Sequence, residues 1–429
     1  MQDRIAIVGG GWAGLACAVE LAAHDVPVAL YEAAQQLGGR ARRVDWDGLA
    51  IDNGQHLMIG AYRETLALMA RLGTLEKLER RALELLLPGF RLRLPRLRKP
   101  LHLGIGLFTA HGLSLREKFA AARGMRDLQA LNFKLPADLP AGELLKQLRQ
   151  PAHLVEKLWA PLCIAALNTP LEQASGQVFC TVLRDSLAGT RADSDVLLNR
   201  ADLSGLLADA ALAYLNRRHC EVHVASKVEG IIRVDRGFHL AGPDVAATRI
   251  VVATHPARLS TLLTALPELA GIVSQAAAFT WQPILTLWLR FTQPPVFPFP
   301  MLGLGDSQAP WAFERNDIAP GVVALVMSAE GPHLHWPPEK LLTNYLGLLA
   351  GQLGPLPKLL SWKTIVEKRA TFACIPNLPR PGNRTRLAGL YLAGDYTAAV
   401  DATDNYPATL EGAVRSGVEC ARLILADSI

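Results

Sequence analysis

The sequence lacks the features that mark several common functional classes. Its six cysteines, in 429 residues, form no CxxC pair and show no metal-ligand spacing. We therefore expect buried thiols in a reducing compartment, and neither disulfides nor a metal site. The formal net charge is only +5 and the basic residues are dispersed, which argues against nucleic acid as a partner.

The chain also lacks a clean membrane-spanning run. The longest uncharged stretch, 269–289, is long enough to cross a bilayer, but polar residues and Pro283 interrupt it. We expect a helix there, followed by a strand over 284–291. The first expected strand, 5–8, follows Met1 almost at once, so no signal peptide fits. The sequence thus predicts a cytoplasmic protein of about two domains.

The strongest positive signal lies in the first 32 residues. A β-branched strand at 5–8 leads into Gly9-Gly-Gly-Trp-Ala-Gly14, an apolar helix follows, and a second strand ends on Glu32. This order is typical of a dinucleotide-binding fold. Gly9 makes the tight turn, Gly11 lets the backbone approach a pyrophosphate, and Gly14 lets the helix pack on the strand. Glu32 stands near the spacing at which an acid binds a ribose.

A second glycine-rich motif, Leu37-Gly-Gly-Arg-Ala-Arg42, follows directly. Its backbone N–H groups and guanidinium forks suit phosphate. With GxGxxG, then Glu, then GGR, the chain resembles the FAD-dependent superfamily of amine oxidases and carotenoid desaturases. The resemblance implies FAD as cofactor, with Arg40 at the pyrophosphate and Glu32 at the adenosine ribose. Amine oxidases often carry a basic residue two places after the acid, where this chain has Ala34.

The resemblance extends to segments far along the chain. The loop at 51–56, on its own a turn signal, passes beside the flavin ring in the superfamily. Val228 matches a valine that contacts the adenine. Gly394 and Asp395 match the ribityl site, and a helix opening near Pro407 points its positive end at the flavin. The implied cofactor-binding residues are Gly9, Gly11, Trp12, Ala13, Gly14, Glu32, Gly39, Arg40, Ala41, Gly54, Gln55, His56, Val228, Gly394, Asp395 and Thr409.

The implied fold class is α/β. A Rossmann-like FAD-binding domain is expected from segments 1–60, 201–260 and 365–429. A second, α+β substrate domain, with a mixed sheet plus helical cap, is expected from 61–200 and 261–364. In it, strands at 284–291 and 321–328 should form an antiparallel floor.

Three segments, 52–65, 158–170 and 406–417, narrow the resemblance. They are similar to the squalene-associated FAD-dependent desaturases of bacterial hopanoid synthesis, whose members are hydroxysqualene dehydroxylases. This family implies reductive removal of the hydroxyl of hydroxysqualene, a long isoprenoid lipid, to give squalene. A carotenoid desaturase of the phytoene or ζ-carotene type and a non-catalytic lipid-handling escort are the alternatives. Amine oxidases usually hold a lysine near flavin N5 on a strand of the second domain. No lysine lies between Lys227 and Lys340, so the comparison with that family disfavours amine oxidation.

The reaction needs an acid beside the leaving hydroxyl. His56, Asp401 and Asp404 lie on the two segments expected near the ring and are the candidates for this catalytic role. The sequence ranks none of them above the others. It also identifies neither the electron donor nor the oligomeric state.

Residues 91–99 alternate basic and apolar side chains and lead into the apolar stretch 101–108. This pattern suits peripheral contact with an anionic membrane, here the cytoplasmic face of the inner membrane. It equally suits a solvated hairpin edge whose apolar continuation lines the core. Both interpretations stay open at the level of sequence.

Overall fold

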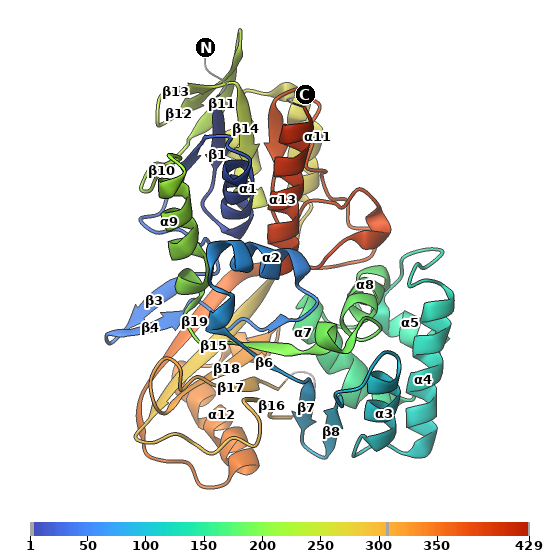
Figure 1. Cartoon of the computed structure of the whole chain (residues 1–429). Helices are drawn as coiled ribbons and strands as arrows, with labels where there is room; N and C mark the ends of the chain where they lie inside the picture. The colour runs from blue at the N-terminus through green and yellow to red at the C-terminus, as the bar shows by residue number, and fades with distance from the viewer. Residues whose placement is uncertain (1–3, 306–308, 428–429) are drawn as a thin grey trace.

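A computed structural model describes residues 4–305 and 309–427. A parallel sheet of five strands forms the upper part of the molecule (Figure 1). The central strands of this sheet are buried at nearly every position, as is usual for parallel strands that are covered on both faces. In spatial order they are β10 (Glu221–His223), β2 (Val28–Tyr31), β1 (Ile5–Val8), β14 (Arg249–Val252) and β20 (Leu390–Leu392).

Helices α1 (Trp12–Ala23) and α13 (Leu410–Ala426) pack against each other beside this sheet. The two helices approach closely because Gly417 has no side chain: a Cβ there would lie 2.2 Å from the carbonyl oxygen of Ala13. Helix α9 (Asp209–Arg217) packs beside α1 and β10. A small antiparallel sheet of β11 (Gly230–Val234), β12 (Gly237–Ala241) and β13 (Val245–Ala247) completes this part.

A second five-stranded sheet forms the lower part of the molecule (Figure 1). All its pairings are antiparallel, so this sheet is antiparallel rather than mixed. One face packs on helix α12 (Pro338–Leu353) through Leu341, Tyr345 and Leu349. The strand order is β16 (Met301–Gly303), β17 (Trp311–Glu314), β18 (Val322–Ser328), β15 (Trp281–Phe291) and β19 (Leu359–Phe372).

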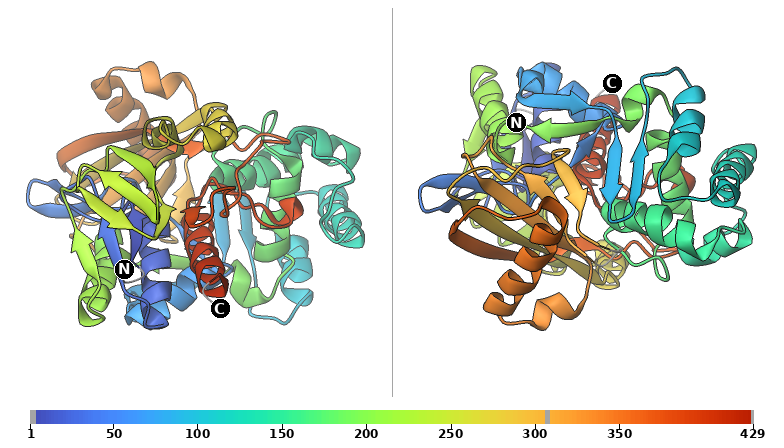
Figure 2. Two further views of the ribbon diagram at one scale, coloured as in Figure 1. Left: turned by 90° about the horizontal axis from the view of Figure 1, so that it is seen from above. Right: turned by 90° about the horizontal axis from the view of Figure 1, so that it is seen from below.

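Helices from the first half of the chain form a cap. Viewed from below, the cap and the α12 sheet lie on opposite sides of the molecule (Figure 2). Short strands and α2 (Arg63–Leu72) connect the cap to the parallel sheet. The cap helices are α3 (Leu101–Thr109), α4 (Leu115–Ala130), α5 (Ala141–Gln147), α6 (Ala152–Leu154), α7 (Ala160–Leu167) and α8 (Gly176–Ser186). The connecting strands include β5 (Met58–Ile59), β6 (Leu78–Arg81), β9 (Val196–Asn199) and the hairpin β7 (Glu84–Leu87)–β8 (Phe90–Arg93).

The expected fold class, an α/β FAD-binding domain with a second α+β domain, is confirmed. The strands of the parallel sheet come from all three chain segments assigned to the first domain. The expected boundary at 364/365 falls inside β19, and the helix expected from Pro407 begins at Leu410. The stretch 269–289 contains α11 (Ala270–Ala277) and the start of β15. Among the described residues, no helix combines the length and apolarity that crossing a membrane requires.

Candidate active site

A cavity of about 670 Å³ lies where the parallel sheet, the antiparallel sheet and the helical cap meet. Its size is that of a typical cofactor or substrate pocket. All the residues expected to bind a cofactor line it except Gly14. The structure therefore brings together residues up to 400 positions apart in the chain, Gly9 and Thr409.

The glycine turn shapes one end of the cavity. Gly9 has a φ of +112°, and a Cβ there would lie 2.5 Å from the carbonyl oxygen of Ala253. A Cβ on Gly14 would lie 2.0 Å from the carbonyl oxygen of Gly9, so Gly14 acts through packing rather than by facing the cavity. A Cβ on Gly11 would meet only the Cα of Gly39, at 3.9 Å. The space before Gly11 is thus an open cradle at the N-terminus of α1.

This cradle fits a pyrophosphate. The first backbone N–H groups of a helix have no partner within the helix, and Trp12 and Ala13, the first residues of α1, line the cavity. No acidic side chain occupies the first turn of α1. The positive end of the helix therefore faces the cavity without a competing carboxylate, which is the usual arrangement at a phosphate site.

The Glu32 side chain, directly after β2, is oriented by two hydrogen bonds. Its two carboxylate oxygens accept hydrogen bonds from the backbone N–H groups of Gly10, at 2.7 Å, and Ala34, at 2.8 Å. These bonds fix the carboxylate at the rim of the cavity, where ribose hydroxyls can donate to its remaining lone pairs. Position 34 carries no basic side chain, but Lys227 and Arg258 also line the cavity.

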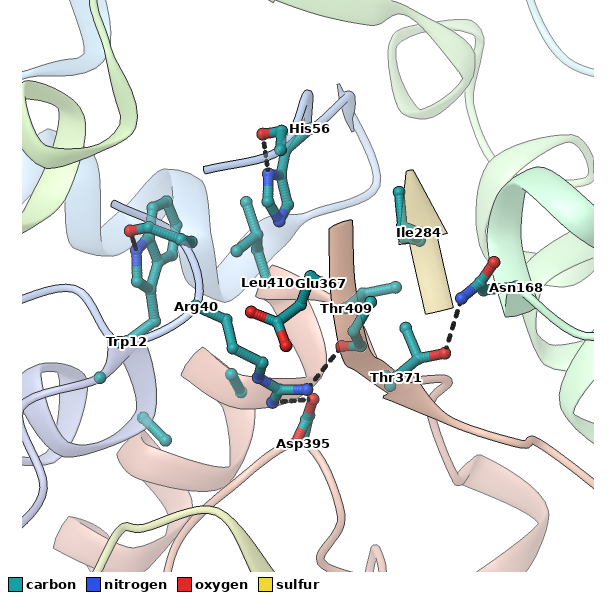
Figure 3. A pocket seen from close by; sticks show the side chains of 18 of the residues that line it. Trp12, Arg40, His56, Asn168, Ile284, Glu367, Thr371, Asp395, Thr409 and Leu410 are labelled. Carbon is teal, nitrogen blue, oxygen red and sulfur yellow. Dashed lines mark hydrogen bonds and ion pairs between the residues drawn. The ribbon is translucent and has the colours of Figure 1, made fainter. Parts of the chain in front are cut away.

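Arg40 connects the N-terminal motif to the C-terminal one (Figure 3). Its guanidinium donates to the carboxylate of Asp395, at 2.6 Å, and to the carbonyl oxygen of Ala370, also at 2.6 Å. The loop that carries Asp395 is in turn held by the half-buried Arg380, which donates to the carbonyl oxygens of residues 395, 396, 397 and 406. The polar lining is therefore fixed by side chains on both motifs.

The N-terminus of α13 also faces the cavity, with Thr409 and Leu410 in its lining. Thr409 is the N-cap residue, and its hydroxyl accepts from the backbone N–H of Gly412 at 3.1 Å. This cap explains why the helix begins three residues after Pro407. The positive end of α13 is thus directed at the cavity, as that of α1 is.

His56 lines the cavity with a defined tautomer (Figure 3). Its Nδ1 lies 2.8 Å from the carbonyl oxygen of Gly54. Because a carbonyl only accepts, Nδ1 carries the proton, and Nε2 of the neutral ring is left as an acceptor. Burial lowers the pKa of His56, so the neutral ring is favoured.

The structure places Asp401 and Asp404 outside the cavity lining. Asp401 is exposed and accepts from the ammonium of Lys134 at 2.7 Å, which holds the pKa of this carboxyl well below its usual range. Asp404 pairs with Arg184 at 2.5 Å. Both carboxylates are engaged elsewhere, so the geometric reason for assigning them as proton donors is removed.

A buried ionic network that no sequence motif indicates includes Asp52 and Gln55. Arg315, with 3% of its side chain exposed, donates to Asp52 at 3.1 Å and to Asp317 at 2.9 and 3.0 Å. It also donates to the side-chain oxygen of Gln55 at 2.5 Å. Glu367, on β19, also lines the cavity, and no sequence motif indicates it (Figure 3). Arg315 and Glu367 reach the site only through contacts between distant chain segments, so no local motif marks either of them.

The rest of the cavity is mostly apolar. Asn168, at the end of α7, fixes the cap against the second sheet by donating to the hydroxyl of Thr371, at 3.0 Å, and accepting from the N–H of Ala329, at 2.6 Å. The apolar lining includes Leu83, Leu85, Leu162, Ala165, Ala166, Phe179, Val182, Leu183, Ile284, Met301, Phe313 and Val326. This surface suits a hydrocarbon chain rather than a charged amine.

Comparison with known proteins decides the family. The family model described as flavin containing amine oxidoreductase matches residues 12–425. The chain belongs to this family. The flavoprotein is similar to the hydroxysqualene dehydroxylase of Rhodopseudomonas palustris, at 29% identity over 99% of both chains. Its similarity to the zeta-carotene desaturase of a Synechocystis species, 43% identity, covers only 18% of this chain and 16% of that one.

Solved structures agree on the fold of the flavoprotein. A putative protoporphyrinogen oxidase from an Exiguobacterium species superposes with a TM-score of 0.69 at 21% identity, over 100% of this chain and 99% of that one. The family match, rather than this likeness of fold, makes FAD the cofactor and the protein an FAD-dependent oxidoreductase. The cradle before Gly11, the fixed Glu32 carboxylate and the two helix N-termini are the features of this chain that fit FAD.

Proposed function

We propose that this flavoprotein removes the hydroxyl of hydroxysqualene to give squalene. The proposal rests on one observation above others: the residues expected to hold FAD and a long apolar wall line the same cavity. The full-length similarity to a hydroxysqualene dehydroxylase supports the substrate, whereas the similarity to a zeta-carotene desaturase is confined to a short segment.

The reaction exchanges a carbon–oxygen bond for a carbon–hydrogen bond. The hydroxyl leaves as water after taking a proton, and bound reduced FAD supplies the hydride and thus both electrons. An allylic carbon carries positive charge as the oxygen departs, and water would recapture it as the alcohol. The residues of the cavity must therefore exclude water and hold the hydroxyl in one place. The apolar lining from α7, α8 and β15 provides the exclusion.

We propose that His56 binds the departing oxygen. Its Nδ1–H donates a hydrogen bond to the carbonyl oxygen of Gly54, so Nε2 is the ring nitrogen left to bind a substrate. Neutral Nε2 accepts a hydrogen bond from the hydroxyl, and protonated Nε2 donates to it. Because burial lowers the pKa of this ring, the donating form grows as the pH falls.

The test is turnover by the purified holoenzyme after chemical reduction of FAD. We expect squalene from hydroxysqualene, and a rate that rises as the pH is lowered until the protein unfolds. His56→Gln should retain FAD, lose most turnover and lose this pH dependence. Asp401→Asn and Asp404→Asn test the two carboxylates suggested by the sequence. If either of them abolishes turnover while His56→Gln leaves it intact, the assignment of His56 is wrong.

The same preparation separates the alternatives. If reduced wild-type holoenzyme forms no squalene, while oxidised holoenzyme introduces double bonds into phytoene or ζ-carotene, the protein is a carotenoid desaturase. If the purified protein is colourless and binds no FAD under any condition, the escort interpretation is supported and the dehydroxylase proposal fails.

We further propose peripheral membrane contact through α3. Three apolar side chains at helical spacing are exposed on this helix: Leu101 by 55%, Ile105 by 40% and Phe108 by 63%. About a quarter turn around α3 from this face, His102 is buried beside the backbone of Leu187, which lines the cavity. Helix α3 thus lies between the surface and the apolar cavity, where a lipid substrate can enter from a bilayer.

The basic segment before α3 is partly neutralised. Arg91 pairs with Glu84 at 2.7 Å, and Arg93 reaches the same carboxylate at 3.8 Å. No ion pair forms on Arg96, Arg98 or Lys99 within the part of the chain that the structure describes. These three residues are therefore the ones to change: their replacement by glutamate should weaken binding to anionic vesicles. Equal binding of wild type and variant, or equal binding to neutral and anionic vesicles, would contradict this contact.

A further inference from the structure

Helix α4 carries a second basic feature that the site and the segment 91–99 leave unused. Arg116, Phe119, Arg123 and Arg126 lie at helical spacing on one face of α4. Together with Arg149, from the loop after α5, they line a hollow on the surface. We call this feature the arginine hollow. Its side chains are exposed, and the hollow is separate from the cavity that holds the flavin site.

The arginines of the hollow are not neutralised by the protein. Among the residues that the structure describes, Arg126 pairs only with its neighbour Asp127, at 3.3 Å and with 75% of the arginine side chain exposed. Across the described ranges 4–305 and 309–427, Arg116, Arg123 and Arg149 have no carboxylate partner. Guanidinium groups gathered in one hollow repel one another, and an anion that bridges them removes that repulsion. Their planar forks match the paired oxygens of a phosphate group.

Apolar side chains border the hollow. Phe119 is 70% exposed and Leu115, one turn earlier, is 60% exposed. Lys118 joins this edge to α3, because its ammonium donates to the carbonyl oxygen of Phe108 at 2.7 Å and lies 5.9 Å from the centre of the Phe108 ring. The exposed apolar faces of α3 and α4 therefore adjoin. A phosphate-binding hollow beside exposed aromatic and aliphatic side chains matches the boundary between lipid headgroups and acyl chains.

We infer that the arginine hollow binds the phosphate of an anionic phospholipid headgroup while the faces of α3 and α4 rest on the bilayer. The inference deepens the proposed function, because a substrate that resides in the bilayer is the reason to dock there. It differs from simple charge attraction, since it assigns particular guanidinium groups to a phosphate. A free phosphate compound and an acidic protein are the other ligands of the same chemistry, and the experiment separates them.

The experiment measures binding of the holoenzyme to phosphatidylcholine vesicles with and without phosphatidylglycerol. Each basic residue near an anionic surface contributes about 1 kcal/mol to binding. Arg123→Gln/Arg149→Gln removes two such residues and should therefore weaken binding to the anionic vesicles about 30-fold. The matched control is Arg217→Gln/Arg236→Gln, which removes the same charge from exposed positions of the other domain. It should change binding less than threefold.

Two further arms test the phosphate and its source. Arg123→Lys/Arg149→Lys keeps the charge but lacks the fork, so it should weaken binding several-fold if guanidinium–phosphate pairs form. Binding as tight as wild type would overturn the assigned pairs. Inorganic phosphate, added at the ionic strength of a chloride control, should not release the protein from vesicles. If it does, and if the protein binds phosphate tightly without vesicles through the same arginines, the bilayer assignment is overturned.

The outcomes of this test are independent of the reaction. Equal loss of vesicle binding in the hollow variant and in the matched control overturns the arginine hollow, whatever the enzyme does. Turnover of hydroxysqualene by wild type in neutral detergent tests the proposed function without any membrane. Each proposal can therefore fail while the other stands. Retention of the flavin absorbance band in both double variants shows that they are folded.

Discussion

Substitution of Gly11 by valine is the sharpest test of the cofactor site. The backbone at Gly11 has φ −74° and ψ 178°, a conformation that valine adopts without strain. The new Cβ would meet nothing closer than the Cα of Gly39, at 3.9 Å. The substitution should therefore change the free energy of unfolding of the apoprotein by no more than about 0.5 kcal/mol.

The effect on FAD should be large for the same geometric reason. The isopropyl group points into the cradle and keeps a pyrophosphate away from the N–H groups of Trp12 and Ala13. Loss of two hydrogen bonds to a charged group, at about 1.5–3 kcal/mol each, weakens binding by about 3–6 kcal/mol, or about 100- to 10,000-fold. The variant should purify as folded, colourless apoprotein.

Two glycines provide the controls. Gly230→Val introduces the same side chain on β11, where nothing lies within 4 Å of the new Cβ, and should leave FAD bound. Gly14→Val should damage the fold itself, because its Cβ would lie 2.0 Å from the carbonyl oxygen of Gly9. The assay is the flavin-to-protein ratio from absorbance, with thermal unfolding of the apoproteins beside it. A Gly11→Val protein with full flavin content would refute the placement of the pyrophosphate.

Two further predictions concern buried charge. Arg315→Met leaves Asp52 and Asp317 buried without their partner and should lower the free energy of unfolding by about 3–5 kcal/mol. Arg4→Met breaks an exposed pair and should lower it by about 1 kcal/mol or less. Equal losses for the two variants in urea denaturation would contradict this prediction. Burial lowers the pKa of His255 to about 4, so folding favours the neutral ring. Its contribution to apoprotein stability is full above pH 6.5 and is lost as the pH falls toward 4. Melting temperatures should therefore fall over this range, and less steeply in His255→Asn; identical slopes would refute the assignment.

Sequence reasoning succeeds here where a structural requirement is local. The strand, glycine turn, helix and second strand of the first 32 residues each follow from neighbours in the chain, and all are found. The same holds for the strand before Gly394. The start of α13 is misplaced because two local signals compete. Proline at 407 suits a first helical turn, but the side chain of Thr409 caps the helix two residues later.

The rest of the site depends on contacts that no local pattern records. Arg315 reads as an ordinary basic residue after an apolar strand, and only folding brings it to Gln55, 260 positions away. Asp404 is the converse case: its place between two flavin motifs predicts a role at the ring, whereas in the structure it pairs with Arg184 and does not line the cavity. We keep the proposed two-domain division, with the last boundary moved to the end of β19.

The Arg315 network is better explained by positioning than by stability. A buried ion pair gains little over a packed apolar group of the same volume, because desolvation offsets the attraction. Here the Arg315 guanidinium both pairs with the Asp52 carboxylate and donates a hydrogen bond to the side chain of Gln55, which is the neighbour of His56 in the chain. Replacing the arginine and both aspartates together by Met and Asn should therefore recover stability without recovering turnover. Recovery of turnover as well would show that the network serves the fold alone, and that His56 is held by its bond to Gly54.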